Sequence, residues 1–176
     1  IYTNSGIKSL LISGDRYKDQ TFRNEASKVV KLFRNNGIYN FTESALGFYV
    51  DSTRTDYKTN VDFLISSNRL VEKEGVYIEK PYKIQTIKED QVTTDYSFTQ
   101  KEENISDTAT YNSIQFSAYD KLLYNPKYLS QSIFLKPGEI YSDTLTNLTR
   151  THLKSLQNFK STNIKFTPIA GSDNEL

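Results

Sequence analysis

Apolar residues in the first third of the chain follow a helical period and then a period of two. One predicted helix face comprises Phe22, Ala26, Val29, Val30 and Phe33, and the following Asn35-Asn36-Gly37 predicts the end of that helix. Apolar residues then alternate with more polar ones over Leu46–Val50 and over Tyr57–Ile65, which predicts two strands. The polar stretch Asp51–Asp56 is short enough to join them as a hairpin. Upstream, Ile7–Ile12 is interpreted as an earlier, shorter helix.

A Pro-Gly turn precedes the most strongly marked helix of the chain. Pro137 fixes its own φ and Gly138 tolerates a positive φ, so the pair predicts a turn. Ser142 is placed to cap a helix that we predict over Ser142–Gln157. Its apolar residues recur at helical spacing and predict one buried stripe, comprising Leu145, Leu148, Leu153 and Leu156. Asn158 follows where a left-handed C-cap is expected.

Three further elements are predicted in the second half of the chain. Pro81–Asp90 has the alternation of a strand, and Asn125–Phe134 is interpreted as a helix that begins at an Asn-Pro pair. After the capped helix, Ser161–Ile169 is predicted to be a strand. Ile164 and Phe166 lie on the same face of that strand.

Two stretches lie outside this simple succession of helices and strands. Residues 91–119 alternate at Tyr96, Phe98, Ile114 and Phe116, which suggests an inserted hairpin that turns within the polar Gln100–Asp107. Residues 69–80 are charged, so we predict an exposed linker there. The resulting domain prediction is a first unit over residues 1–68, the linker 69–80, and a second unit over residues 81–176 with the insertion 91–119.

The order of these elements resembles that of a known family. Leu135-Lys136-Pro137-Gly138-Glu139-Ile140-Tyr141, the leucine-rich helix after it, and the strand with Asn163-Ile164-Lys165-Phe166 resemble a POTRA domain. This is the polypeptide-transport-associated module of outer-membrane assembly proteins of the BamA and TamA type. Asn158 stands where that family usually has glycine. In a weaker upstream copy, Gly37-Ile38-Tyr39-Asn40-Phe41 matches the pattern at its glycine and at Tyr39 and Phe41, and departs from it at Ile38.

The resemblance implies an α+β fold of two tandem POTRA-like modules. Each module has the order β-α-α-β-β, with a small sheet covered by two helices. The first module would have its opening strand missing or reduced to Ile1 and Tyr2, and the second would be cut before its last strand, near residues 171–176. The second would also carry the inserted hairpin. The aromatic-rich composition resembles a Bacteroidota version of the family, either a TamA-like lipoprotein of the TamL type or BamA.

The resemblance also implies a function in protein assembly. The chain would be the periplasmic part of an outer-membrane protein that assembles or translocates other outer-membrane proteins, and its own membrane β-barrel would lie outside this fragment. Partners would be unfolded outer-membrane protein clients and accessory assembly proteins, either TamB-like proteins or lipoproteins. Clients would add a strand to the edges Leu46–Ser52 and Asn163–Pro168. The expected site residues are Leu46, Phe48, Val50, Asn163, Ile164, Lys165 and Phe166.

Composition narrows the functional classes. Of the 176 residues, 36% are hydrophobic and 13% are aromatic, with 13 Tyr and 10 Phe that supply large buried areas. The formal net charge is +1, from 22 basic and 21 acidic residues, which offers no electrostatic argument for nucleic acid as a partner. With no Cys, the chain has no disulfide or thiolate chemistry. No apolar run is long enough to span a bilayer as a helix.

Residues suited to catalysis are scarce. His152 is the only histidine, which excludes a metal site built from several histidines, and we interpret it as a packing residue at the border of its helix. Acidic residues such as Glu89 and Asp90 lie in polar stretches and are interpreted as solvated charges. We therefore expect no enzymatic activity, no cofactor and no metal. The alternative function is a receptor or surface adhesion module that binds its partner through the tyrosines of residues 91–119.

Overall fold

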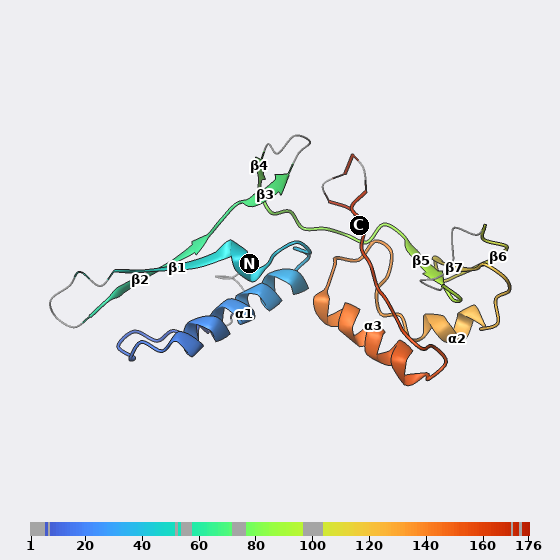
Figure 1. Cartoon of the computed structure of the whole chain (residues 1–176), viewed down its shortest axis with the longest axis horizontal. Coiled ribbons are helices and arrows are strands. Elements are labelled where there is room, and N and C mark those ends of the chain that lie inside the picture. Colours follow the sequence, from blue (N-terminus) through green and yellow to red (C-terminus); the bar gives the residue numbers. More distant parts are fainter. Residues whose placement is uncertain are drawn as a thin grey trace. The chain divides into compact units, whose positions relative to one another are not determined.

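The computed structural model describes residues 6, 8–51, 53, 58–71, 77–96, 104–169, 171–172 and 174–176. The chain divides into two compact units, Ile1–Lys83 and Ile84–Leu176. Both combine helices with small sheets, so the fold is α+β (Figure 1). The identification of these units as POTRA modules remains a prediction.

The described residues of the first unit form one long helix and two hairpins. Helix α1 spans Asp19–Asn35, and a short 3-10 turn at Glu43–Ala45 leads into strand β1, Leu46–Asp51. Strand β1 pairs antiparallel with β2, Asn60–Ile65, as the alternating pattern predicts. Five of the connecting residues, 52 and 54–57, lie outside the described part of the chain.

The core of the first unit confirms the predicted face of α1. Val29 is fully buried, and Phe33 stacks on the fully buried Phe41 with a ring-centroid distance of 4.5 Å. Gly37 has φ +92°, which ends the helix as expected and lets the chain turn back toward Phe41. Tyr82 completes the cluster by an edge-to-face contact with Phe41 at 4.9 Å.

Two predictions for the first unit are wrong. The described residues of the predicted helix Ile7–Ile12, which are Lys8–Ile12, have no helical structure, and Ile7 lies outside the described residues. The Leu10 N–H instead donates to the buried Glu25 carboxylate on α1, 2.8 Å away, because a six-residue helix gains too little to offset its nucleation. The predicted linker contains a second hairpin, formed by β3, Asn68–Val71, and β4, Tyr77–Lys80.

Among the residues that the structure describes, the second unit has a three-stranded sheet of order β5-β7-β6. Strand β5, Asp90–Thr93, runs parallel to β7, Ile114–Ala118, and β7 pairs antiparallel with β6, Asp107–Tyr111. The predicted strand Pro81–Asp90 is therefore largely wrong, because only its last residue, Asp90, belongs to a strand of this sheet. Its Thr86 instead forms two isolated bridges, one antiparallel to Ile140 and one parallel to Glu175.

The predicted insertion is also corrected, because it supplies the core of the second unit. Ile114 and Phe116 are buried beside Leu129 and Leu135 in one cluster. The hairpin turns at Asn112-Ser113, where φ is +51° and +63°, and not within Gln100–Asp107. Positive φ at both positions suits the type I′ geometry whose twist matches paired strands. Phe98 lies outside the described residues.

Two helices pack on this core. Helix α2 is shorter than predicted, Pro126–Ser130, and begins as expected where the Asn125 side chain accepts from the Lys127 N–H at 3.0 Å. Helix α3, Asp143–Ser155, confirms the predicted helix, and Ser142 caps it by accepting from the Leu145 N–H. The left-handed residue after α3 is Gln157, with φ +56°, one position before the expected Asn158.

The predicted leucine stripe of α3 is only partly correct. Leu145 packs against the core, but Leu148 and Leu156 are each 37% exposed. The buried residues of α3 are Thr146 and Thr149. Their hydroxyl groups are satisfied inside the protein: Thr146 donates to the Ser142 carbonyl oxygen, and Thr149 accepts from the Phe134 N–H, both at 2.9 Å. The burial of threonine therefore carries no penalty for an unpaired hydroxyl group here.

Candidate functional site

The expected site residues of the first unit lie on β1 with their side chains turned into the unit. Leu46 packs against the core cluster, and Phe48 contacts Phe22 of α1 edge-to-face at 5.1 Å. Val50 is half-buried on the same strand. These side chains anchor β1. Within the described part of the chain β1 pairs only with β2, so its second edge offers main-chain groups to a partner.

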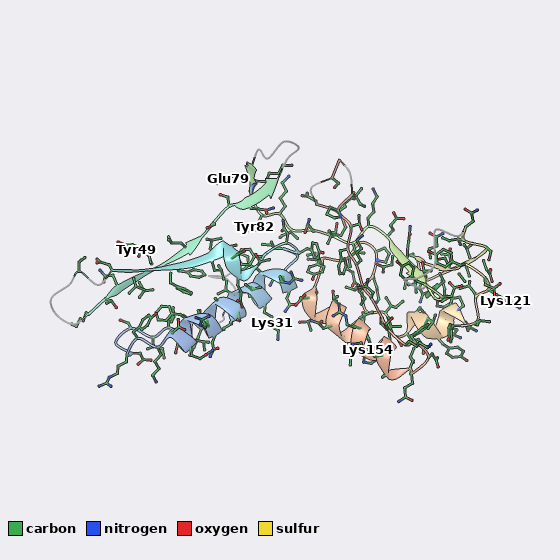
Figure 2. All side chains as sticks on the ribbon, in the orientation of Figure 1. Lys31, Tyr49, Glu79, Tyr82, Lys121 and Lys154 are labelled. Atoms are coloured by element: carbon green, nitrogen blue, oxygen red, sulfur yellow. The ribbon has the colours of Figure 1, made fainter. Side chains whose placement is uncertain are left out.

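The opposite face of this hairpin carries apolar residues that the sequence analysis treated only as the polar side of the pattern. Tyr49 is 60% exposed and Leu64 is 53% exposed. Figure 2 labels Tyr49 on the hairpin, and Phe48 beside it in sequence faces α1. The sequence did contain a signal for this exposed face. Tyr49 and Leu64 are large residues at positions that the alternating pattern assigns to the polar side.

The expected site residues of the second unit lie on an extended segment that follows α3. Ile164 and Phe166 are half-buried against the core, and Phe166 meets the buried Tyr141 edge-to-face at 5.0 Å. Asn163 and Lys165 are exposed between them. The predicted alternation of faces is confirmed. Figure 1 shows this segment in red, returning from the end of α3 toward the C-terminus.

The predicted sheet pairing of this segment is absent from the described residues. No strand is assigned over residues 161–169, and the backbone N–H groups of Asn163, Ile164 and Lys165 donate to no other described residue. Extended backbone that is held by its side chains but lacks a ladder partner is suited to accept an added strand. The segment therefore has the main-chain chemistry expected of a strand-accepting edge.

A groove of about 1060 Å³ lies between this segment and β5. One wall is the extended segment, residues 158–169, and the other includes β5 with its flanking residues. The buried side chains of Leu129, Ile133 and Leu135 contribute apolar surface to the groove. The groove thus combines an apolar lining with backbone on both sides.

Two polar atoms in these walls have no hydrogen-bond partner among the described residues. They are Oδ2 of Asp90 and Oγ1 of Thr162, and both atoms are buried. Burial, with a smaller contribution from the Glu139 carboxylate, raises the pKa of the Asp90 carboxyl group to about 6. An acceptor of this kind is satisfied by a donor from a bound molecule or by its own protonation.

The raised pKa of Asp90 leads to a pH prediction. Its folded-state pKa lies above the unfolded value, so the folded chain binds more protons and stability falls as pH rises from about 4 to about 6. Solvent screens this half-buried group, so we expect Asp90→Asn to raise the free energy of unfolding of the second unit by only about 1 kcal/mol at pH 7.5. At pH 4 the variant should match the parent chain. Urea unfolding at both pH values measures the difference.

The matched control for this prediction is Glu89→Gln, which neutralises the exposed carboxylate next to Asp90. It should leave the pH dependence of unfolding intact. An Asp90→Asn variant with the same pH dependence as the parent chain would show that Asp90 does not cause it.

The described residues contain no other cluster suited to catalysis. His152 is exposed on α3, and its ring lies edge-to-face on Phe134 at 4.8 Å, which agrees with a packing contact at the helix border. No group of three or more His, Cys, Asp or Glu residues that could hold a metal ion occurs among them. None of the helices in the described ranges is long and apolar enough to cross a membrane.

Comparison with known proteins gives a likeness to solved structures only. No protein-family model matches the chain, and no curated protein matches it. Two chains of known structure do match, one of them in the crystal structure of Haemophilus influenzae BamA POTRA3-5. That likeness has 14% sequence identity and a TM-score of 0.49, and it covers 95% of this chain and 49% of the other. This chain therefore spans about half the length of the chain that it matches, and a likeness of this size assigns no family.

Proposed function

We propose that this chain is a periplasmic binding and positioning module of the POTRA type, in a protein that assembles or translocates outer-membrane proteins. Its ligands are extended segments of unfolded outer-membrane protein clients, and accessory assembly proteins are further partners. Binding occurs by strand addition to β1 and to the segment Asn163–Phe166, without catalysis, cofactor or metal. The finer assignment to a Bacteroidota TamA-like lipoprotein or to BamA belongs to the same proposal.

The proposal rests on the extended segment after α3, whose side chains pack on the core while its backbone lacks a strand partner among the described residues. Its alternate side chains Ile164 and Phe166 hold it on the core, while the N–H groups of Asn163 and Lys165 donate to no described residue. Strand addition takes affinity from main-chain hydrogen bonds and requires little of the client's sequence, which suits a module that handles many unfolded clients. The succession of Pro-Gly turn, α3 and extended segment supports the same reading.

The alternative function is a receptor or adhesion module that binds its partner through residues 91–119. In that range Ile114 and Phe116 are buried in the core, whereas Tyr96 is 59% exposed. No specific observation favours this alternative, so strand addition is the function that the geometry supports best.

The proposal is tested by photocrosslinking from exposed positions to a urea-unfolded outer-membrane protein. Crosslinking groups placed at Asn163 and Lys165 should capture the unfolded client and should capture the folded form of the same protein far less. The matched control is Lys154, an exposed position on α3. Equal capture from Lys154 and from the two segment positions would contradict strand addition at this site.

A further inference from the structure

We propose that the side of the second unit formed by α2, α3 and their flanking residues docks on an anionic phospholipid surface, with Leu123 and Tyr128 in the headgroup region. This inference goes beyond the proposed function and does not rest on it. Client binding uses main-chain groups of extended backbone, whereas docking on lipid uses the side chains of this helical layer.

The charged residues of the second unit are separated along the sequence. Residues 121–138 and 144–172 contain seven of the nine basic residues of Ile84–Leu176 and none of its eleven acidic residues. The seven are Lys121, Lys127, Lys136, Arg150, Lys154, Lys160 and Lys165. The acidic residues lie in the remaining stretches, which include β5 and β6. A net charge of +1 for the whole chain is therefore compatible with a strongly basic part.

The fold places the two basic stretches against each other. Just before α2, the Tyr124 ring packs on Phe159 with a centroid distance of 4.9 Å, and its hydroxyl group donates to the Asn158 carbonyl oxygen at 3.2 Å. After α2, the Phe134 N–H donates to Thr149 Oγ1 on α3 at 2.9 Å. These contacts on both sides of α2 hold it beside the C-terminal half of α3 and the residues that follow (Figure 1).

The lysines at this junction are available to a partner. The exposed ones are Lys121, Lys127, Lys154 and Lys160. Among the residues that the structure describes, none of the four forms an ion pair. Figure 2 labels two of them, Lys121 ahead of α2 and Lys154 on α3. Lysines gathered in this way attract an anionic surface over a Debye length, which is about 8 Å at physiological salt.

Large apolar side chains project from the same layer. Leu123 is 79% exposed and Tyr128 is 67% exposed, and each lies within two residues of a lysine, Lys121 and Lys127 respectively. Leu156 at the end of α3 is 37% exposed. Exposed leucine, and tyrosine with an apolar ring and a polar tip, are suited to the boundary between headgroups and acyl chains. The layer therefore offers both attractions that hold a peripheral protein on a membrane, apolar insertion and charge.

The kind of basic residue distinguishes a lipid surface from other anionic partners. Six of the seven basic residues are lysine and one is arginine. Arginine binds carboxylate and phosphate groups in a fixed geometry and is enriched at protein interfaces, whereas lysine is depleted there. A lysine ammonium group on a flexible stem acts as a point charge, which suits a fluid layer of headgroups without fixed positions. Lipid is therefore the occupant that this composition favours.

Cosedimentation of the full chain with vesicles tests the proposal. Vesicles of equal parts phosphatidylcholine and phosphatidylglycerol should bind the chain at least tenfold more tightly than vesicles of phosphatidylcholine alone. At about 1 M salt, where the Debye length is about 3 Å, this difference should disappear. Equal binding to both kinds of vesicle at low salt, or no binding to either, would overturn the proposal.

Charge-reversal variants locate the docking surface. Lys121→Glu combined with Lys127→Glu should lower the affinity for the anionic vesicles at least tenfold, because each lysine near such a surface contributes about fivefold. The matched control is Lys31→Glu combined with Lys58→Glu, which reverses two exposed lysines of the first unit and gives the same net charge. Equal weakening by both pairs would show that the vesicles respond to net charge and not to this layer, and would overturn the proposal.

Insertion of Leu123 is measured separately, because the chain contains no tryptophan. In the Leu123→Trp variant the emission should shift to the blue with anionic vesicles, and brominated lipids should quench it. Tyr49→Trp, at an exposed position of the first unit, should show neither change. Vesicle binding without either signal from residue 123 would mean that Leu123 stays outside the headgroup region, which contradicts the proposal.

The remaining outcomes separate lipid from a second copy of the chain, and this inference from the proposed function. Self-association at low salt that Lys121→Glu with Lys127→Glu abolishes, in a chain that does not bind vesicles, would make the layer an interface between copies and overturn the proposal. Client crosslinking from Asn163 and Lys165 is carried out without lipid. Loss of vesicle binding with that crosslinking intact would therefore overturn only the inference about lipid.

Discussion

Replacing Lys165 by proline is expected to lower the affinity for an unfolded outer-membrane protein at least tenfold. Proline has no N–H group and holds φ near −65°, so it removes a main-chain donor and distorts the neighbouring backbone in the segment Asn163–Phe166. Each lost hydrogen bond contributes about 1 kcal/mol, and a tenfold loss corresponds to about 1.4 kcal/mol. Fluorescence anisotropy with a labelled, urea-unfolded client measures the change.

The control for this variant must separate main-chain pairing from loss of the Lys165 side chain, which is exposed on this segment. Lys165→Ala removes that side chain and keeps the N–H group, so it should retain both the stability and most of the affinity for the client. Circular dichroism reports whether both variants keep their fold. Client binding that is unchanged in a folded Lys165→Pro variant would show that this edge is irrelevant.

Replacing Phe116 by alanine is expected to destabilise the second unit strongly. Phe116 is fully buried on the central strand β7, within the cluster that includes Ile87, Ile114 and Leu129. Truncation of a buried phenylalanine costs about 3–5 kcal/mol, which is a large part of the roughly 5–15 kcal/mol that stabilises a typical domain. Amide exchange should become fast at Leu129, while Val29 in the first unit keeps its protection.

The control for Phe116→Ala comes from the same stretch that the sequence analysis predicted to be an insertion. Tyr96→Ala removes an aromatic side chain that is 59% exposed, so the free energy of unfolding should change by less than about 0.5 kcal/mol. If Phe116→Ala were equally harmless, residues 91–119 would be an appendage and not part of the core.

Strong local signals predicted the elements that the structure confirms. The apolar face of α1, the glycine that ends it, the alternation of β1 and β2, and the Ser142 cap of α3 each depend on residues close in sequence. The partners of β5 and β7 depend on tertiary contacts, which explains why the parallel pairing was missed. Asn112-Ser113 is also a weaker turn signal than an Asn-Gly pair. The polar stretch Gln100–Asp107 therefore looked like the better turn.

The candidate site was also predicted only in part, because some of its features depend on local residues and others on tertiary contacts. Period-two alternation correctly placed Ile164 and Phe166 on the core side and Lys165 outside. The residues near an extended segment in the sequence do not determine whether it pairs with another strand. Among the described residues, this segment pairs with none. The buried face of α3 was missed because threonine was treated as polar, although the Thr149 hydroxyl group is satisfied by the Phe134 N–H.

The central claim is that unfolded clients pair with the main chain of the segment Asn163–Phe166. Amide hydrogen exchange of the full chain, with and without a urea-unfolded outer-membrane protein diluted into the sample, measures this most directly. We predict that exchange at Asn163 and Lys165 slows at least tenfold with the client, while exchange at exposed positions of α3 such as Lys154 stays the same. Unchanged exchange at Asn163 and Lys165 in a sample where the client is bound would contradict the account.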